Sequence, residues 1–360
     1  MRLTFLVLHA LFVLTCCNDG GEKPNETDSR SPRIPRKTSI LSPSPNKLLT
    51  IGEAVAFKIS SKKEIDSILF DDDHQKIIYE TDSFTWQSTK ALTGEKRFKI
   101  TVYFNEGKSE THFPRVRFLS DVEPEKLTYK VIEKYPHDPE AYTQGLFFMD
   151  DVLYESTGRK GRSSIRKVNL HTGEKIKQVN IDSEYFGEGS TYWGDKIIML
   201  TYRSNVGFVF DAELNQTGKF NYNHEGWGAT TRGDTLIVSD GTEKLHLLDP
   251  RDYSEIGTLE VYDNKGPIKS LNELEIIDGL IYANIYTEDN IAVIDPNTGK
   301  VLKMIDLSGL LSNSEKSGLD EVNDVLNGIA YHKSSGKIYV TGKDWPSLFQ
   351  VEFLKKEEAL

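Results

Sequence analysis

The stretch Gln144-Gly145-Leu146-Phe147-Phe148 begins a pattern that recurs along this chain of 360 residues. Each copy opens a short strand with a polar or aromatic residue, next to glycine in four of five cases, and a second apolar strand follows after a turn. The other openings are Glu188-Gly189-Ser190-Thr191-Tyr192, Trp227-Gly228-Ala229-Thr230, Asn272-Glu273-Leu274-Glu275-Ile276 and Asn327-Gly328-Ile329-Ala330-Tyr331. They are spaced by 44, 39, 45 and 55 residues, and the last interval contains a polar insertion at residues 312–323.

A repeat of this length built from short strands is typical of β-propeller blades. Helical solenoids have a similar period, but the apolar residues here alternate with period 2 rather than 3.6. The sequence therefore predicts an all-β fold in which residues 128–354 form a five-bladed β-propeller. The segment Tyr129–Glu133 is expected beside Leu348–Phe353, because joining the two ends in one blade removes an exposed strand edge.

Short alternating segments also fill residues 45–121. In two of them the apolar residues share one face: Val55, Phe57 and Ile59, and Phe98, Ile100, Val102 and Phe104. Several such strands within 80 residues or so, separated by Lys, Glu, Gly and Asp turns, predict a small Ig-like β-sandwich. Because this segment has no concentration of histidine, carboxylate or glycine-rich chemistry, we expect a spacer or accessory binding module.

The first 17 residues have one arginine, a short apolar run and then the only two cysteines of the chain, Cys16 and Cys17. This pattern predicts an export signal, because the run is too short for a bilayer-spanning helix. Leu14-Thr15-Cys16-Cys17 resembles a bacterial lipobox; Cys17 is the preferred lipidated residue and Cys16 the alternative, and a plain secretory peptide is the other interpretation. Residues 18–44, rich in Pro, Ser and charge, are expected to form a flexible tether.

Composition narrows the possible functions. A net charge of -11 argues against a nucleic-acid groove, which needs a basic face. Without cysteine beyond residue 17 there is no disulfide or thiol nucleophile in the folded part, and the eight histidines show no zinc-ligand spacing. We therefore expect no metal or organic cofactor and no nucleic-acid partner. From the N-terminal pattern we expect a monomer that is exported to the bacterial cell envelope and contacts the membrane only through its lipid anchor.

The first strands of propeller blades line the central channel, so equivalent positions of the repeats form a ring. That ring is Gln144, Glu188, Trp227, Asn272 and Asn327. A structural repeat needs only small or apolar residues there, so this polar set predicts a binding or catalytic site; a channel-lining water network is the alternative. A second set lies at equal offsets, five residues past Ile198, Ile281 and Ile338: Arg203, Tyr286 and Lys343.

Residues 135–353 resemble the plant and bacterial glutaminyl-peptide cyclotransferase family. The stretches that carry the resemblance run in order through the whole segment: Pro136-His137-Asp138-Pro139-Glu140-Ala141-Tyr142-Thr143-Gln144-Gly145-Leu146, Tyr154-Glu155-Ser156-Thr157-Gly158, Gly161-Arg162-Ser163-Ser164-Ile165-Arg166, Tyr185-Phe186-Gly187-Glu188-Gly189, Glu225-Gly226-Trp227-Gly228, Leu271-Asn272-Glu273-Leu274-Glu275, Val325-Leu326-Asn327-Gly328-Ile329-Ala330 and Val340-Thr341-Gly342-Lys343-Asp344-Trp345-Pro346.

The resemblance implies a five-bladed propeller and an enzyme that converts the N-terminal glutamine of peptides into pyroglutamate and ammonia. It implies that Glu188 is the proton shuttle and that Gln144, Trp227, Asn272 and Lys343 line the pocket. Plant members have Trp in the Ala-Asn-Ile-Trp motif, where this chain has Tyr286. We expect Lys343, with Asn272 or Gln144, to stabilise the amide oxygen, and Trp227 and Tyr286 to hold the glutamine side chain.

Each of these residues also has a structural interpretation. The alternative for Trp227 is core packing within its blade, for Lys343 a surface ion pair with Asp344, and for Glu188 a structural pair with Arg203. For two further residues, Asn327 and Glu273, we favour structural hydrogen bonds between blades, and for His137 we see no catalytic need.

Two other functions compete with the cyclase. A non-catalytic peptide- or glycan-binding propeller on the cell surface would keep the aromatic residues without needing Glu188. A propeller enzyme resembling streptogramin lyase would be expected to depend on a metal.

Overall fold

The computed structural model describes residues 35–105 and 107–356. Within them the chain forms thirty strands and one short helix, α1 (Asn313–Lys316), which confirms the expected all-β class. No helix in this part of the chain is long and apolar enough to cross a bilayer. The predicted signal peptide, with Cys16 and Cys17, lies outside the described residues, as does most of the predicted tether.

Ten strands form the N-terminal part of the described chain, in three sheets ordered β1-β3-β6, β2-β10-β7 and β5-β4-β8-β9. Their bounds are β1 (Thr38–Ser42), β2 (Lys47–Thr50), β3 (Ala54–Ser61), β4 (Ile65–Asp71), β5 (Lys76–Tyr79), β6 (Ser83–Gln87), β7 (Gly94–Arg97), β8 (Lys99–Phe104), β9 (Ser109–His112) and β10 (Arg115–Leu119).

The predicted inward faces of these strands are confirmed. In β3 the side chains of Val55, Phe57 and Ile59 are buried while their neighbours are exposed. Phe57 packs against three other aromatic rings at 5.0–5.4 Å, within one apolar cluster that draws on all three sheets. Strand β1 begins at Thr38 and pairs with β3, so regular structure starts inside the segment predicted as tether, because a polar composition does not prevent an edge strand from pairing.

The other twenty strands form three four-stranded sheets, β12 to β15, β16 to β19 and β20 to β23, and one sheet of eight. Their bounds are β11 (Glu125–Pro136), β12 (Thr143–Met149), β13 (Val152–Thr157), β14 (Ser164–Val168), β15 (Lys175–Asn180), β16 (Gly187–Trp193), β17 (Lys196–Thr201), β18 (Val206–Phe210), β19 (Gln216–Asn221), β20 (Ala229–Arg232), β21 (Thr235–Ser239), β22 (Lys244–Leu248), β23 (Glu255–Glu260), β24 (Leu271–Ile277), β25 (Leu280–Ile285), β26 (Asn290–Ile294), β27 (Val301–Asp306), β28 (Leu326–His332), β29 (Lys337–Gly342) and β30 (Ser347–Lys355).

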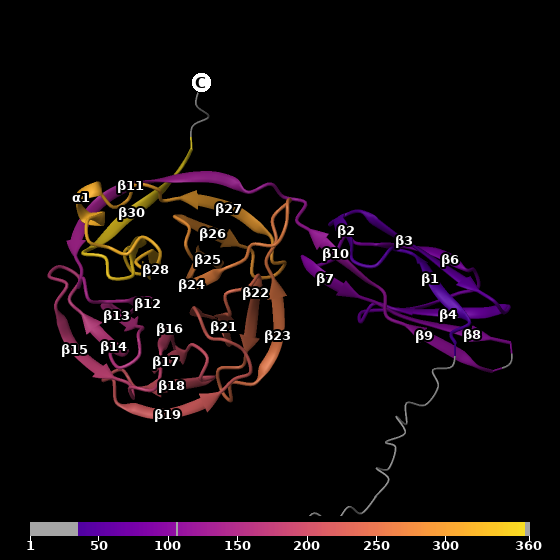
Figure 1. Ribbon diagram of the computed structural model, residues 1–360, viewed down its shortest axis with the longest axis horizontal. Helices are drawn as coiled ribbons and strands as arrows, with labels where there is room; N and C mark the ends of the chain where they lie inside the picture. The colour runs from indigo at the N-terminus through magenta and orange to yellow at the C-terminus, as the bar shows by residue number, and fades with distance from the viewer. Residues whose placement is uncertain (1–34, 106, 357–360) are drawn as a thin grey trace, which may run out of the picture. The chain divides into compact units, whose positions relative to one another are not determined.

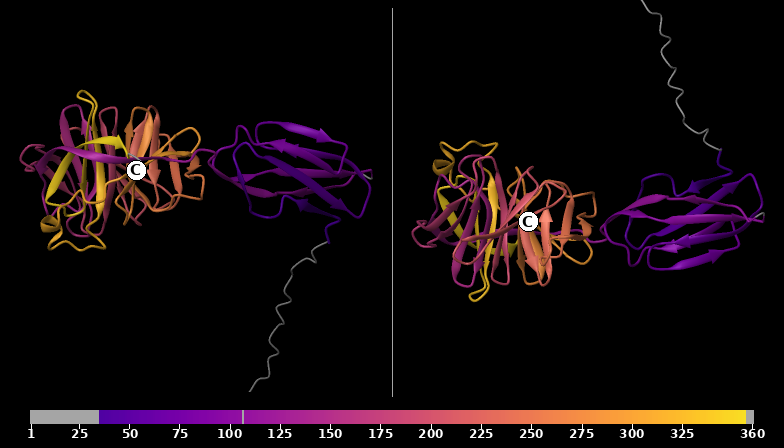
Figure 2. Two further views of the ribbon diagram at one scale, coloured as in Figure 1. Left: turned by 90° about the horizontal axis from the view of Figure 1, so that it is seen from above. Right: turned by 90° about the horizontal axis from the view of Figure 1, so that it is seen from below.

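The first and last strands of this C-terminal part pair with each other, as the sequence predicted. Strand β11 runs antiparallel to β30, with Tyr129 opposite Phe353 and Tyr135 opposite Leu348, and the two lie side by side in Figures 1 and 2. The first residues of β11 also pair in parallel with β27. This second pairing merges β24–β27 with β28–β30 and β11 into one eight-stranded sheet, where the sequence analysis expected separate blades.

The first strands of the four-strand groups lie innermost in Figure 1. They contact one another in a closed cycle, β12, β16, β20, β24, β28 and back to β12. Glycine permits this close approach: a Cβ atom on Gly228 would lie 1.9 Å from the Asn272 carbonyl oxygen, and one on Gly189 would lie 2.5 Å from that of Trp227. The glycines of the repeat are therefore required where neighbouring inner strands meet.

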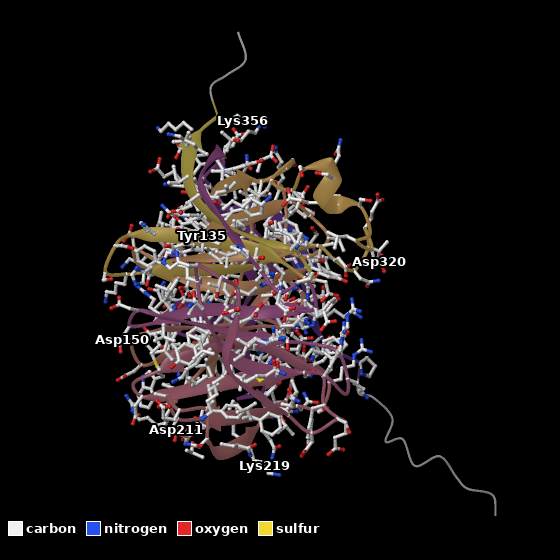
Figure 3. All side chains as sticks on the ribbon, turned by 90° about the vertical axis from the view of Figure 1, so that its left-hand side faces the viewer. Tyr135, Asp150, Asp211, Lys219, Asp320 and Lys356 are labelled. Carbon is white, nitrogen blue, oxygen red and sulfur yellow. The ribbon has the colours of Figure 1, made fainter. Side chains whose placement is uncertain are left out.

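The insertion that carries α1 lies on one face of this ring. In the side view of Figure 3, Asp320 of the insertion and Asp150 of the β12–β13 turn lie at opposite faces. Asp324, directly after the insertion, pairs with Arg159, and its backbone carbonyl accepts a hydrogen bond from the Trp345 indole nitrogen at 2.8 Å. These contacts attach the insertion to the face where the inner strands begin.

Candidate active site

A cavity of roughly 190 Å³ lies where the inner strands begin. All six residues predicted for the site line it: Gln144, Glu188, Trp227, Asn272, Tyr286 and Lys343. Three aromatic residues that the sequence analysis did not select complete the lining: Tyr142, Phe186 and Tyr202.

Strand register explains why these residues meet. Gln144, Glu188 and Asn272 are each the second residue of an inner strand. The next strand of the sheet contributes the first residue after its own end. Tyr286 follows β25, and its amide donates to the Ser270 carbonyl at 2.8 Å. Lys343 follows β29, and its amide donates to the Val325 carbonyl at 2.9 Å. The β16–β17 and β24–β25 strand pairs thus each present side chains to the cavity from two adjacent strands.

The placement of Arg203 in the second set was wrong by one residue. The Tyr202 amide donates to the Phe186 carbonyl, so Tyr202 is the register equivalent of Tyr286 and Lys343. The offset should have been counted from Ile197, the second residue of β17, because a shift of one residue turns a strand side chain to the opposite side. Arg203 is exposed and pairs with Glu225 at 2.7 Å, so it does not pair with Glu188.

The overlooked Tyr142 and Phe186 had a sequence signal. Each lies two residues before a ring residue, Gln144 and Glu188 respectively, and residues two apart on an extended chain point to the same side. An aromatic residue is also typical of core packing, so this signal alone does not select them. Room for Phe186 comes from Gly158, where a Cβ atom would lie 2.6 Å from the phenyl ring.

Lys343 and Gln144 form a buried hydrogen-bonded couple. The Lys343 ammonium donates to Gln144 Oε1, and Asn327 Nδ2 donates to the same oxygen at 3.3 Å and to the Thr143 carbonyl at 2.9 Å. Because an ammonium group only donates, the Gln144 oxygen must face it. The Asn327 contacts agree with its predicted structural role.

Lys343 is buried and does not form the surface ion pair considered from the sequence. Its side chain is buried, and the ammonium nitrogen lies 4.7 Å from the ring centre of Tyr142 and 5.5 Å from that of Tyr286. Burial lowers the pKa of Lys343 to about 8, with Glu188 opposing the change and Arg159 adding to it. Asp344, the surface partner considered from sequence, instead pairs with Arg159 at 2.8 Å.

Glu188 is a buried carboxyl group without a hydrogen-bond partner among the described residues. It is 5 % exposed and lines the cavity. Burial raises the pKa of Glu188 well above its usual value, Lys343 opposes this rise and Glu225 adds to it. A carboxyl group in such surroundings exchanges protons closer to neutral pH than a solvated one.

Five aromatic rings surround the cavity in an unbroken series of edge and tilted contacts. In order they are Tyr142, Phe186, Tyr202, Trp227 and Tyr286, with centroid distances of 6.2, 6.1, 6.2 and 5.6 Å between successive rings. Lys343 closes the series, because its ammonium group lies over the first and last rings. The half-buried Trp227 thus forms part of the cavity lining and is not a core residue of its sheet.

Two neighbouring residues of β24 have different environments. The Asn272 side-chain oxygen is buried without a hydrogen-bond partner in the described chain, and the residue lines the cavity. Glu273 accepts backbone hydrogen bonds from Leu146 at 3.2 Å and Ile329 at 2.8 Å, which join three inner strands. Glu273 therefore has the structural role expected for it, and Asn272 keeps free hydrogen-bonding capacity.

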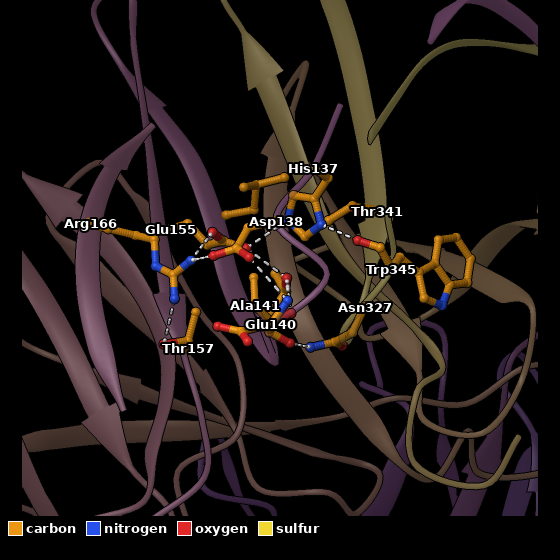
Figure 4. Close-up of polar contacts among 12 residues, drawn as sticks. His137, Asp138, Glu140, Ala141, Glu155, Thr157, Arg166, Asn327, Thr341 and Trp345 are labelled. Carbon is orange, nitrogen blue, oxygen red and sulfur yellow. Dashed lines mark hydrogen bonds and ion pairs between the residues drawn. The ribbon is translucent and has the colours of Figure 1, made fainter. Parts of the chain in front are cut away.

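Figure 4 shows a buried charged network that includes His137, Glu155 and Arg166. His137 contacts the Trp345 carbonyl through Nδ1 at 2.6 Å and Glu155 through Nε2 at 2.9 Å. Glu155 also accepts from the Thr143 hydroxyl at 2.7 Å. The segments that carry Gln144 and Lys343 are thereby linked, which is a structural role for His137. No group of three or more His, Cys, Asp or Glu side chains within residues 35–105 and 107–356 is arranged to hold a metal ion.

Comparison with known proteins agrees with this geometry. Residues 102–353 match the family described as glutamine cyclotransferase. A glutaminyl-peptide cyclotransferase from Arabidopsis thaliana is 40% identical over 233 residues, which are 64% of this chain and 72% of the plant protein. The chain belongs to the glutamine cyclotransferase family. The crystal structure of Myxococcus xanthus glutaminyl cyclase matches with a TM-score of 0.62 and 32% identity, over 65% of this chain and all of that one.

The family match covers every residue that lines the cavity of this glutamine cyclotransferase. It begins at residue 102, ahead of the predicted propeller boundary at 128, and so includes the last N-terminal strands, β9 and β10. Most of the N-terminal sheets lie outside the match.

Proposed function

We propose that this glutamine cyclotransferase cyclises the N-terminal glutamine of peptides in the cavity, with Glu188 as the group that carries the proton. One observation carries the proposal: an unpartnered buried carboxyl group shares a small cavity with a buried lysine, two side-chain amides and an aromatic lining. The cavity accepts a single terminal residue, and the rest of the peptide stays outside it.

The reaction is an internal acyl transfer that balances without a co-reactant. The α-amine nitrogen attacks the γ-carboxamide carbon and forms the ring C–N bond. The bond from this carbon to the amide nitrogen then breaks. One proton leaves the attacking nitrogen, and one is gained by the departing nitrogen, which leaves as ammonia.

Glu188 suits both proton transfers. As a carboxylate it accepts the proton of the attacking amine, and as a carboxylic acid it returns that proton to the leaving nitrogen. Its raised pKa makes the carboxylate a better base and keeps the return transfer favourable near neutral pH. Proton transfer of this kind contributes about 10²–10⁴-fold to a rate.

Lys343 is placed to stabilise the oxygen of the tetrahedral intermediate. The negative charge that develops there in a water-poor cavity is stabilised by fixed donors, each worth about 2.7–4 kcal/mol. The hydrogen bond to Gln144 fixes the direction of the ammonium group. Asn272, with its unpartnered amide oxygen, would bind an N–H group of the substrate.

The aromatic lining supplies orientation. Trp227 and Tyr286 both line the cavity and meet at 5.6 Å with nearly perpendicular planes, and we expect them to flank the aliphatic part of a glutamine side chain. Holding this chain folded brings amine and carboxamide together, and such proximity accounts for much of the catalysis in intramolecular reactions. Tyr286, in place of the Trp of plant members, adds a hydroxyl group, and we expect an altered substrate preference with the same reaction.

We interpret the C-terminal part as a five-bladed β-propeller at residues 128–354. The cyclic contacts of five inner strands support this count, because the eight-stranded sheet divides into two groups once the dual pairing of β11 is recognised. For residues 45–121 we propose an Ig-like β-sandwich, supported by three small sheets around one apolar cluster and extended at its start by β1.

We further propose that the protein is an exported monomer, lipid-anchored in the bacterial cell envelope through Cys17 or, failing that, Cys16. The support is the lipobox-like sequence. Metabolic labelling with a fatty acid tests this: Cys17→Ala should abolish incorporation and Cys16→Ala should retain it. Labelling lost only in Cys16→Ala would move the anchor by one residue.

Ammonia release from a Gln-initiated peptide tests the catalytic proposal. The matched control is the same peptide with an acetylated N-terminus, since an acylated amine cannot attack. We expect ammonia and pyroglutamyl peptide from the first substrate only, unchanged by a chelator. Peptide binding without ammonia release would favour the non-catalytic binding propeller, and activity lost with chelator would favour a metal-dependent enzyme.

A further inference from the structure

Two histidines form a stacked pair outside the cavity. His224 precedes β20 and His246 lies in β22, and their rings are 3.7 Å apart between centroids with planes within 10°. His246 is buried and His224 half-buried. Neither is used in the reaction described above.

The hydrogen bonds of the pair define its charge. Both ring nitrogens of His246 face carboxylates, Asp240 at 3.0 Å and Glu255 at 3.2 Å. Because ionised carboxylates only accept, His246 fits the site as an imidazolium with two N–H donors. The Nδ1 of His224 faces the Glu225 carbonyl at 2.8 Å, so it carries the hydrogen, while its buried Nε2 has no partner among the described residues.

The local charges agree with this assignment. Burial alone would lower the pKa of His246, but the bonds to Asp240 and Glu255 raise it above its usual value. Burial lowers the pKa of His224, and the neighbouring His246 lowers it further. A neutral imidazole therefore stacks on a charged one. The titratable groups that face the pair are Asp240 and Glu255, which contact His246, and Tyr222, whose ring centre lies 5.0 Å from that of His224.

Two residues that bond the histidines, Glu225 and Asp240, lie next to groups that contact Trp227. The side chain of Glu225, whose backbone carbonyl bonds His224, accepts the Trp227 indole N–H at 3.1 Å. On the other side, Asp240 is followed by Gly241, where a Cβ atom would lie 2.5 Å from the indole ring. The Trp227 amide itself donates to the carbonyl of Ser239, the residue before Asp240. The histidine pair thus links Glu225 to the segment that contains Asp240 and Gly241, and the Trp227 indole lies between these two parts of the chain.

We propose that the His224–His246 pair is a positioning device that holds Trp227 in its substrate-binding orientation and loosens this hold when His246 loses its proton. The inference rests on the proposed function, because it assigns Trp227 to substrate binding. When the proton is lost, one His246 nitrogen presents a lone pair to a carboxylate. The repulsion weakens the link to Asp240 and so the packing of Gly241 against the indole. The hold on Trp227 is therefore present at low pH and lost as pH rises through the pKa of His246.

The test is the pH dependence of Trp227 fluorescence together with steady-state kinetics. Subtracting the Trp227→Phe spectrum isolates the signal of this residue from the other three tryptophans. The wild type should show a fluorescence step above pH 6.5 or so, the usual histidine value. His246→Gln should lack the step and raise KM about tenfold with a smaller change in kcat, as expected for a displaced substrate wall. His74→Gln, on an exposed histidine of the N-terminal part, is the matched control and should behave as wild type.

A second variant keeps the inference testable if His246→Gln does not fold. Glu255→Gln removes the more exposed partner and should move the fluorescence step to lower pH, since one of the two stabilising carboxylates is lost. An unmoved step in Glu255→Gln, or a wild-type step and KM in folded His246→Gln, would overturn the proposal. Absence of ammonia release by the wild type would instead refute the proposed function, and the fluorescence result would still decide whether the pair positions Trp227.

Discussion

Replacing Lys343 with methionine should make the protein much less active and, at neutral pH, more stable. The lysine is buried with a pKa of about 8 instead of the usual 10.5. Since one pKa unit is worth about 1.4 kcal/mol, the buried charge costs about 3 kcal/mol of folding free energy below pH 8. Methionine has a similar length and removes this cost.

The lost hydrogen bond to Gln144 offsets part of the gain. It costs about 1 kcal/mol, because the Gln144 oxygen still accepts from Asn327. We therefore expect Lys343→Met to increase the free energy of unfolding by about 2 kcal/mol near pH 7 and to lower kcat about 10²–10³-fold through loss of the oxyanion donor.

The sign of the pH dependence gives the sharper assay. A folded-state pKa below the unfolded value means that the unfolded chain binds the proton more strongly, so the Lys343 contribution improves as pH rises from about 8 to 10.5. Urea unfolding near pH 7 and near pH 10 should show wild-type stability rising relative to Lys343→Met by up to about 3 kcal/mol. Parallel pH dependence of the two proteins would refute a buried charge at this position.

Two other substitutions test the geometry of the cavity. Gly228→Ala should destabilise the protein by about 3 kcal/mol in urea unfolding, because its methyl group would meet the carbonyl oxygen of the next inner strand at 1.9 Å; an unchanged midpoint would contradict the close approach of these strands. Tyr202→Ala should raise KM for a Gln-peptide about tenfold while Arg203→Ala leaves it within about twofold, and the reverse order would restore Arg203 to the site.

The sequence revealed the inner strands because their packing demands particular residues. Glycine at positions such as Gly189 and Gly228 is needed where backbones approach, and the ring residues beside these two glycines, Glu188 and Trp227, line the cavity. These two requirements produce a regular pattern along the sequence. All six predicted residues therefore line one cavity, although their chemical roles remain proposals.

Other features depend on strand register and on contacts between distant segments, which the spacing of the sequence repeats does not determine. A strand start located only to within one residue placed Arg203 in the second set in place of Tyr202. The second partner of β11 arises from a pairing between segments far apart in the chain, so the merged sheet was not foreseen. The stacked His224 and His246 come from different strands, and no sequence rule brings them together.

The most direct test of the central claim compares Glu188→Gln with Glu140→Gln, the same change at an exposed glutamate, in ammonia release from a Gln-peptide. A carboxamide keeps the size of Glu188 but cannot carry the proton. We predict a loss of 10²-fold or more, roughly 10²–10⁴, for Glu188→Gln with intact folding and peptide binding, and wild-type turnover for Glu140→Gln. Wild-type turnover in folded Glu188→Gln would contradict the claim.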